Sequence, residues 1–212
     1  MKTENRNRLL LPAAMLTAAM LIMALLSCNG KSSTTDMTDP YEATGTINGH
    51  EYVDLGLSVK WATCNVGAYK PEDYGDYYAW GEAYTKSSYY IDNIKGTARD
   101  VAHVEWGGTW RMPTKAEIEE LIDNCDYEWT TLNGVEGGRF TSRKNGKSIF
   151  LPVAGGRAGT SLDDAGSKGT YWSSTPLEGS TLGAYCLFFG SDFLDWDWCS
   201  RAIGQSVRPV SE

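Results

Sequence analysis

The chain has 212 residues, of which 22% are charged, and a formal net charge of −8 at pH 7. Acidic residues outnumber basic ones by 27 to 19 and the basic ones form no stripe, which argues against nucleic acid and anionic membrane surfaces as partners. Eight Trp, twelve Tyr and 23 Gly indicate short strands, tight turns and many aromatic surfaces, as in an extracellular recognition module more than in a helical enzyme.

The N-terminus has the layout of an export signal. Three basic residues within the first eight positions precede an apolar run from Leu9 to Leu26. The run ends in Leu25-Leu26-Ser27-Cys28, which resembles the lipobox of bacterial lipoproteins, where the cysteine is acylated on sulfur. We therefore expect residues 1–27 to be a lipoprotein signal peptide and Cys28 to carry the lipid. The alternative is an uncleaved membrane anchor; both place the rest of the chain outside the cytoplasm.

Residues 28–45 contain almost nothing that could form a core, so we expect a lipid anchor followed by a flexible tether. This predicts an outer-membrane lipoprotein that faces the periplasm or the cell surface and is anchored without spanning the membrane. Residues 46–212 are expected to form one folded domain. Removing three basic residues and one acidic residue with the signal changes the net charge of −8 to −10.

Periodicity and turn signals predict the elements of this domain. Glu51–Leu55 and Ser58–Thr63 read as a first hairpin around Gly56, residues 76–82 as a strand or an aromatic loop, and residues 98–105 as a short helix. The firmest helix is Lys115–Asn124, because Thr114 and Glu117 form a capping box and an apolar stripe follows. Strands are expected at 128–132, 138–143, 147–153, 170–175, 184–189, 195–201 and 205–210. Early helices followed by consecutive hairpins predict an α+β fold.

Once Cys28 is assigned to lipid, four cysteines remain: Cys64, Cys125, Cys186 and Cys199. An even number in an oxidising compartment predicts two disulfides. If the turn of the terminal hairpin centres between Asp192 and Phe193, Cys186 lies opposite Cys199 and pairs with it. Cys64 is then left with Cys125. The alternative is four buried free thiols. No metal is expected, because the chain has no C-x-x-C and only two His.

Three stretches resemble a known family when taken in order: GTWRMPTKAE at 108–117, YWSST at 171–175 and GQSVRPV at 204–210. They are similar to the Fibrobacter succinogenes major paralogous domain, which is common in lipoproteins and surface proteins of Bacteroidetes-type bacteria. VDLGLSVKWATC at 53–64 looks like the opening of the same group. The resemblance implies a C-type-lectin-like domain, also similar to the formylglycine-generating enzyme, with few helices and short antiparallel strands. It implies no established activity. Pro209 replaces a cysteine that many relatives carry, so the family's disulfide arrangement does not transfer directly.

We expect no enzyme and no cofactor. His103 could serve a cysteine as a base, but each non-lipid cysteine has an expected disulfide partner, so His103 is interpreted as a packing or surface residue. The copper site of formylglycine-generating relatives uses a close cysteine pair, whereas Cys186 and Cys199 read as a hairpin staple. Gly155-Gly156-Arg157 lacks the P-loop lysine and is interpreted as a turn. A hydrolase remains an alternative if a deep pocket brings His103 or two acids to catalytic distance.

Binding is the better-supported hypothesis, and it centres on the terminal hairpin. Alternation puts Tyr185, Leu187, Phe189, Trp196 and Trp198 on one face, the expected core, with Cys186, Phe188, Asp195, Asp197 and Cys199 on the other. The predicted ligand-binding residues are Asp192, Phe193, Asp195, Asp197 and Trp198. Aromatic rings supply contact area, and carboxylates accept sugar hydroxyls or basic side chains. We predict a non-catalytic, lectin-like envelope protein that binds a glycan or protein ligand. The alternatives are a solvated acidic hairpin and a structural envelope component without a ligand.

Overall fold

Short antiparallel strands dominate the computed structural model of this chain, which describes residues 41–82 and 94–212. The predicted signal peptide, Cys28 and nearly all of the predicted tether lie outside the described residues. The elements follow in this order: β1 (Gly45–Ile47), β2 (His50–Val53), β3 (Lys60–Ala62), α1 (Val101–Trp106), α2 (Lys115–Asn124), β4 (Cys125–Leu132), β5 (Val135–Ser142), β6 (Ser148–Pro152), β7 (Gly156–Ala158), β8 (Ser161–Asp163), β9 (Gly169–Pro176), β10 (Gly183–Phe189), β11 (Leu194–Ser200), β12 (Gly204–Gln205) and β13 (Val210–Ser211).

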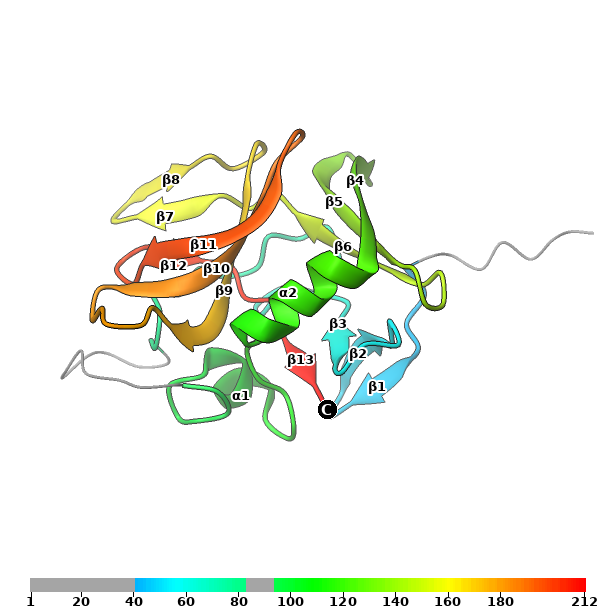
Figure 1. Cartoon of the computed structure of the whole chain (residues 1–212), viewed down its shortest axis with the longest axis horizontal. Coiled ribbons are helices and arrows are strands. Elements are labelled where there is room, and N and C mark those ends of the chain that lie inside the picture. Colours follow the sequence, from blue (N-terminus) through cyan, green and yellow to red (C-terminus); the bar gives the residue numbers. More distant parts are fainter. Residues whose placement is uncertain (1–40, 83–93) are drawn as a thin grey trace, which may run out of the picture. The chain divides into compact units, whose positions relative to one another are not determined.

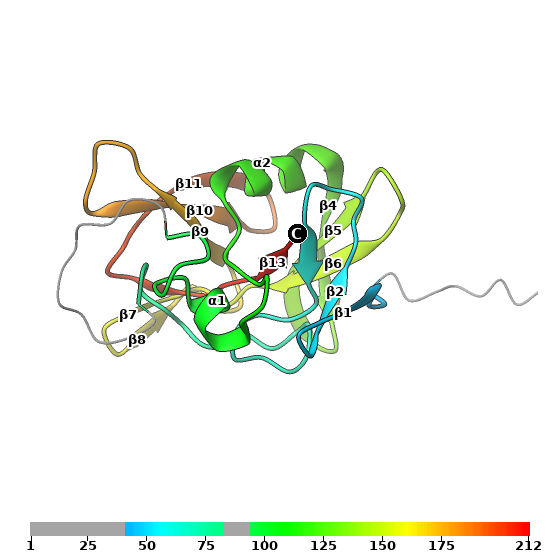
Figure 2. The same cartoon turned by 90° about the horizontal axis from the view of Figure 1, so that it is seen from below.

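These strands form four small sheets, in which every strand pair is antiparallel. Their orders are β1-β2-β3-β13, β4-β5-β6, β11-β10-β9 and β12-β7-β8. The last strand, β13, joins the end of the chain to the first sheet beside β3, as Figures 1 and 2 both show. Helix α2 packs against β4 and against the β11-β10-β9 sheet (Figure 1).

The α+β class with a lectin-like architecture, expected from the sequence, is therefore wrong. The described residues contain two helices, of 6 and 10 residues. The rest of their regular structure consists of antiparallel strands, which outweigh the helices. The overturned expectation gave too much weight to the region before Lys115, whose described residues form one helix, the short α1. No helix in residues 41–82 and 94–212 is long and apolar enough to cross a membrane.

Helix α2 confirms the boundaries expected for it. The Thr114 hydroxyl accepts from the Glu117 N–H at 3.2 Å and the Glu117 carboxylate accepts from the Thr114 N–H at 2.8 Å, which completes the capping box. Ile118 and Leu121 are buried in the core, and Cys125 ends the helix and begins β4. Local sequence signals were sufficient to predict this helix, because the capping box and the apolar stripe indicate the same boundaries.

The core consists of two clusters of buried side chains. One lies among β2, β3, α2, β4–β6 and β9–β10 and includes Trp61, Ile118, Phe140 and Leu151. The other is rich in tryptophan and includes Trp80, Trp106, Trp110 and Trp172. Several indole N–H groups in it donate to backbone carbonyls, such as Trp80 Nε1 to Ser173 O at 2.7 Å, so the aromatic bulk is buried with its polar atoms satisfied.

Three strands were not expected, and one expected strand is divided. β1 pairs with β2 through the Asn48-Gly49 turn, and β7 pairs with β8. The segment Gly155–Arg157 is therefore not a simple turn: only Gly155 has a positive φ, of 65°, and β7 starts directly after it. A Cβ on Gly155 would lie 2.2 Å from the Asp163 carbonyl oxygen, so glycine allows this close approach. The expected strand at 205–210 is divided between β12 and β13, which lie in different sheets.

One of the two expected disulfides is confirmed. Cys186 and Cys199 are bonded, with their Cα atoms 6.2 Å apart. The register is two residues away from expectation, because Cys186 lies opposite Asp197, and Ala184 lies opposite Cys199. The Cys64–Cys125 bond is wrong: both are free thiols. Cys64 follows β3 of the first sheet, whereas Cys125 begins β4 of another and is buried in the first core cluster.

Candidate functional site

The stretches that carry the family resemblance form a buried frame. Arg111 donates from both terminal nitrogens to the Glu117 carboxylate at 2.8 and 2.7 Å, and its backbone pairs with Val210 in both directions. Burial raises the pKa of Glu117, but the Arg111 guanidinium and the Thr114 N–H outweigh it and hold that pKa below its usual 4.5. The stretch at 108–117 is thereby joined to the end of the chain.

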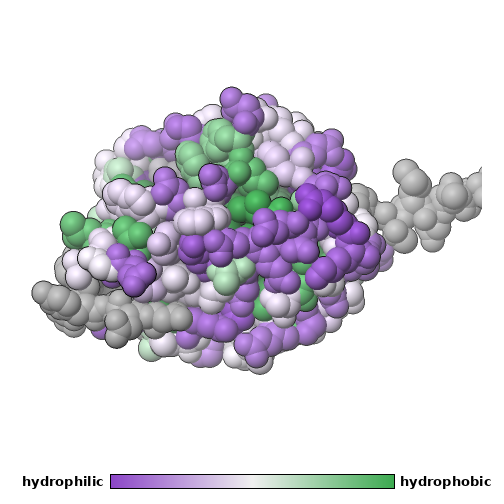
Figure 3. All heavy atoms as spheres, viewed as in Figure 1, coloured by the Kyte–Doolittle hydropathy of each residue, from purple (hydrophilic) through white to green (hydrophobic). Residues whose placement is uncertain are grey.

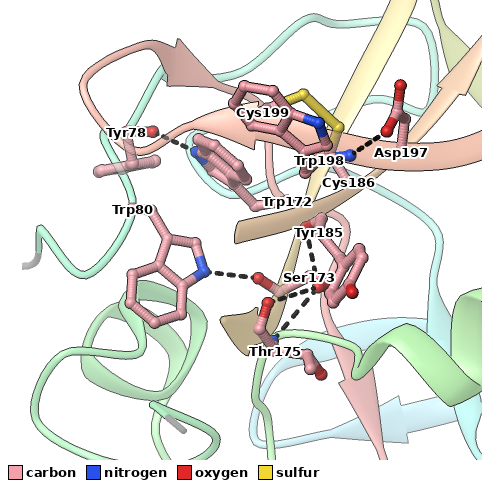
Figure 4. The surroundings of a disulfide bond; sticks show 10 residues. All are labelled: Tyr78, Trp80, Trp172, Ser173, Thr175, Tyr185, Cys186, Asp197, Trp198 and Cys199. Atoms are coloured by element: carbon pink, nitrogen blue, oxygen red, sulfur yellow. Dashed lines mark hydrogen bonds between the residues drawn. A yellow bond between two sulfur atoms is a disulfide. The ribbon is translucent and has the colours of Figure 1, made fainter. Parts of the chain in front are cut away.

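The YWSST stretch occupies the middle of this frame. The Trp172 backbone N–H donates to Ser206 O at 3.1 Å and its indole N–H donates to Tyr78 O at 2.7 Å. Ser174 N–H donates to Pro113 O at 2.7 Å, and Lys115 N–H donates to the Thr175 hydroxyl at 3.0 Å. Figure 4 shows the Trp172 ring between the disulfide and the Trp80 ring, and Ser173 beside Trp80, whose indole N–H donates to its carbonyl.

Arg208 connects the last stretch to the opening one. It is 1% exposed and donates from Nε to Asn65 Oδ1 at 2.8 Å and from Nη1 to the carbonyls of Ala62 and Thr63 at 3.1 and 2.7 Å. Burial lowers the pKa of Arg208. The residues of all four stretches are thus engaged with one another.

The predicted ligand-binding residues do not form one surface. Asp192 is exposed in the tip, where Phe193 packs on Phe188 with ring centroids 4.7 Å apart. Asp195 and Asp197 lie on the face that carries Phe188 and Cys186, opposite those residues in β10. Their carboxylates accept the backbone N–H of the next residue at 2.8 and 2.7 Å. In the view of Figure 3, apolar residues gather in a band along the β10–β11 hairpin, below a hydrophilic tip.

Trp198 lies on the opposite face of this hairpin, across from Tyr185. It was expected in the core, but it is 54% exposed, so that expectation is wrong for Trp198. Trp196 does pack as expected: its ring meets Tyr185 edge-on at 5.5 Å, and Lys115 Nζ lies 3.5 Å from its centroid. The five predicted residues are therefore separated between the tip and two faces.

A cavity of about 260 Å³ opens beside the hairpin, on the face of Asp195 and Asp197. It lies between the β12-β7-β8 and β11-β10-β9 sheets. Its lining comes from all six of their strands and the adjoining loops: Gly156, Ala158, Asp163, Asp164, Thr170, Phe188, Cys199, Ser200, Ile203 and Gln205. The disulfide fixes β11 to β10 at this wall, since Cys199 is part of the lining.

Gln205 is the most unusual residue of the lining. It is 2% exposed, and its backbone N–H and C=O both pair with Tyr78 at 3.0 Å. Its side-chain Oε1 has no hydrogen-bond partner in the described part of the chain. Because buried polar atoms are almost always paired, this acceptor is an exception in the lining of the cavity.

Carboxylates provide the charge of the cavity. Asp163 accepts from the Ser161 hydroxyl at 2.5 Å, and Asp164 pairs with Lys168 Nζ at 3.0 Å. Phe188, Ile203 and Ala158 supply apolar surface, and Thr170 and Ser200 supply hydroxyls. Such a combination of apolar wall and a few polar groups is typical of ligand sites.

Most of this lining was missed by the sequence reasoning, which found the neighbouring Asp195 and Asp197 but none of the acids of β7–β8. The available signal was the pair Gly155-Gly156 directly after a buried strand, followed by exposed polar residues and Asp163-Asp164. It was interpreted only as a turn. Gln205 lay inside an expected strand, and nothing in its neighbours indicates that its side chain would be unpaired.

The other candidate groups belong to the frame or the core. His103 lies on α1, with Nδ1 3.3 Å from Trp110 O, as a packing residue. Burial raises the pKa of the half-buried Cys64 thiol and raises that of Cys125 to about 11. Among residues 41–82 and 94–212, no three His, Cys, Asp or Glu side chains gather as a metal site requires.

Comparison with models of known families, with curated proteins and with solved structures finds no match to this chain.

Proposed function

We propose that this chain is a non-catalytic, outer-membrane lipoprotein whose folded domain binds a ligand in the cavity beside the β10–β11 hairpin. The observation that carries the proposal is a cavity of about 260 Å³ with both apolar and polar lining, which includes Gln205, a buried residue whose Oε1 is unpaired. The volume is just below the roughly 300–1,000 Å³ of sites for drug-sized ligands. A single sugar ring or a single side chain of a protein ligand matches this size.

Membership of the Fibrobacter succinogenes major paralogous domain family is part of the proposal. Its support is that the four resembling stretches contact one another in one buried frame, for example through the backbones of Arg111 and Val210 and through Arg208 with Thr63 O. Stretches that build the buried frame are expected to recur among relatives. The loops held by this frame are expected to vary, and the ligand that they bind is expected to vary with them. The lipid anchor is proposed from the lipobox-like sequence at residues 25–28.

The binding proposal is tested by filling the cavity. Ser200 is exposed and lines it, so Ser200→Trp should occupy the space without disturbing the core. Thr131→Trp adds the same side chain at an exposed site on β4, away from the lining. The purified lipoprotein and both variants are applied to glycan and peptide arrays. We expect Ser200→Trp to lose the bound spots and Thr131→Trp to keep them. Equal binding by all three proteins would refute the cavity as the site.

The two faces of the hairpin give a second test. Asp195→Ala with Asp197→Ala removes charge on the cavity face, and Trp198→Ala removes the exposed ring on the other. We expect the aspartate variant alone to bind less on the same arrays. Loss of binding only on replacing Trp198 would move the site to the opposite face.

A further inference from the structure

We propose that the cavity receives a lysine side chain of a partner protein, with the ammonium group at the polar end and the aliphatic stem along the apolar wall. The inference rests on the proposed function, because it names the ligand class of the same site. Asp163 and Asp164 are the ionisable side chains of the lining, and no Lys, Arg or His is among the described residues that form it. The site therefore favours a cation over a neutral or anionic group.

The negative charge extends beyond the cavity along β11. Asp195 and Asp197 share the face of the lining residue Phe188, and each accepts a hydrogen bond from the following backbone N–H. Neither they nor Asp163 form an ion pair with a residue in the described part of the chain, whereas Asp164 pairs with Lys168. Three carboxylates on one surface are thus left without a cationic partner.

The Gln205 amide supplies the second, independent observation. Its Oε1 is a buried acceptor without a donor, while the residue's backbone groups are already paired with Tyr78. An ammonium group carries three donors and no acceptor. It can donate to the amide oxygen and to a carboxylate of the lining together, which a single hydroxyl cannot do. In this structure the oxygen has almost no accessible surface, so binding requires the amide to rotate about its last side-chain bond toward the ammonium group.

The apolar part of the lining fits the remainder of a lysine. Phe188, Ile203 and Ala158 form a wall against which a four-carbon stem can lie while the charged head reaches acceptors. A cation near the Phe188 ring gains further attraction from the aromatic face. A cavity of about 260 Å³ takes one side chain and leaves the partner's backbone outside, which matches recognition of a single exposed lysine.

The test uses the purified lipoprotein in detergent and three probes. The probes are acetyl-Gly-Lys-Gly-amide, the same peptide with norleucine in place of lysine, and the neutral disaccharide cellobiose. Titration followed by ligand-observed NMR should show the lysine peptide binding at least tenfold more tightly than the norleucine peptide, and more weakly as salt is raised. Asp163→Asn should weaken the lysine peptide about fivefold. Asp123→Asn, an exposed acid on α2 outside the lining, should leave it unchanged.

Gln205→Leu removes the buried acceptor and should also reduce binding of the lysine peptide. If Gln205→Leu does not fold, Asp163→Asn still provides the test, because Asp163 is exposed. Equal binding of the lysine and norleucine peptides, or no effect of Asp163→Asn, would overturn the inference. Binding of cellobiose alone, blocked by Ser200→Trp, would overturn the lysine assignment and keep the proposed function. If Ser200→Trp also leaves every array signal unchanged, the proposed function fails as well.

Discussion

Replacing both Cys186 and Cys199 with alanine removes the cross-link between β10 and β11 and leaves their backbone pairing in place. The two cysteines are 13 residues apart, and closing a loop of about 15 residues stabilises a protein by about 3 kcal/mol in the chain-entropy model. For a protein of this size, such a loss lowers the melting temperature by about 6–12 °C. We expect the double variant to fold and to unfold at a lower urea concentration than the native protein.

Urea titration followed by tryptophan fluorescence measures this loss, because several of the tryptophans are buried. The slope of the unfolding free energy against urea should not fall if the native structure persists, because the unfolded chain without the cross-link exposes at least as much surface. Adding dithiothreitol to the native protein should produce the same shift, and adding it to the double variant should produce none. An unchanged midpoint would refute the stabilising role of this bond. A remaining effect of dithiothreitol on the double variant would reveal a second disulfide, contrary to the free thiols of Cys64 and Cys125.

Three further predictions concern the frame and the free thiols. Glu117→Gln leaves the buried Arg111 guanidinium without its carboxylate and should cost about 3 kcal/mol in urea titration. Because the pKa of Glu117 lies below 4.5 in the folded state, its charge adds stability above pH 4.5, and this stability is lost as the pH falls through the folded-state pKa. Glu117→Gln should lack this acid-dependent loss of stability. Parallel stability-versus-pH profiles for the native protein and the variant would contradict this reasoning. Arg208→Lys should cost about 1–3 kcal/mol, since an ammonium cannot reproduce the guanidinium's bonds to Asn65, Ala62 and Thr63, and an unchanged urea midpoint would contradict it. In the lipid-anchored protein, whose Cys28 sulfur is acylated under the proposed anchor, iodoacetamide should label Cys64 before Cys125 in the native state and only these two after unfolding without reductant, as read by intact mass. No label or four labels would contradict the assignment.

The elements predicted well are those whose signals are local. The Lys115–Asn124 helix follows from a cap and a stripe within a dozen residues, and the β5–β6 hairpin follows from Asn145-Gly146. The Cys186–Cys199 bond was found from the hairpin pattern even though the register was two residues off, because cysteines diagonal across two strands are still close.

What the sequence could not provide depends on contacts between distant segments. The sequence around Cys64 and Cys125 does not indicate that the two lie apart, because their separation depends on the arrangement of the sheets. β7 and β8 are mostly exposed and lack the alternation that signals a half-buried strand. The cavity needs β7–β8, β10–β11 and Gln205 together. Its position therefore follows from tertiary structure, and only the neighbouring Asp195 and Asp197 were within reach of pattern reasoning.

Chemical-shift mapping by NMR on ¹⁵N-labelled protein shows directly whether a ligand binds between the two small sheets. The strongest-binding probe from the arrays is titrated into the protein. We expect perturbations at the side-chain amide of Gln205 and at the backbone of Thr170 and Ser200, which line the cavity. Perturbations confined to the Trp198 face, with Gln205 unmoved, would contradict it.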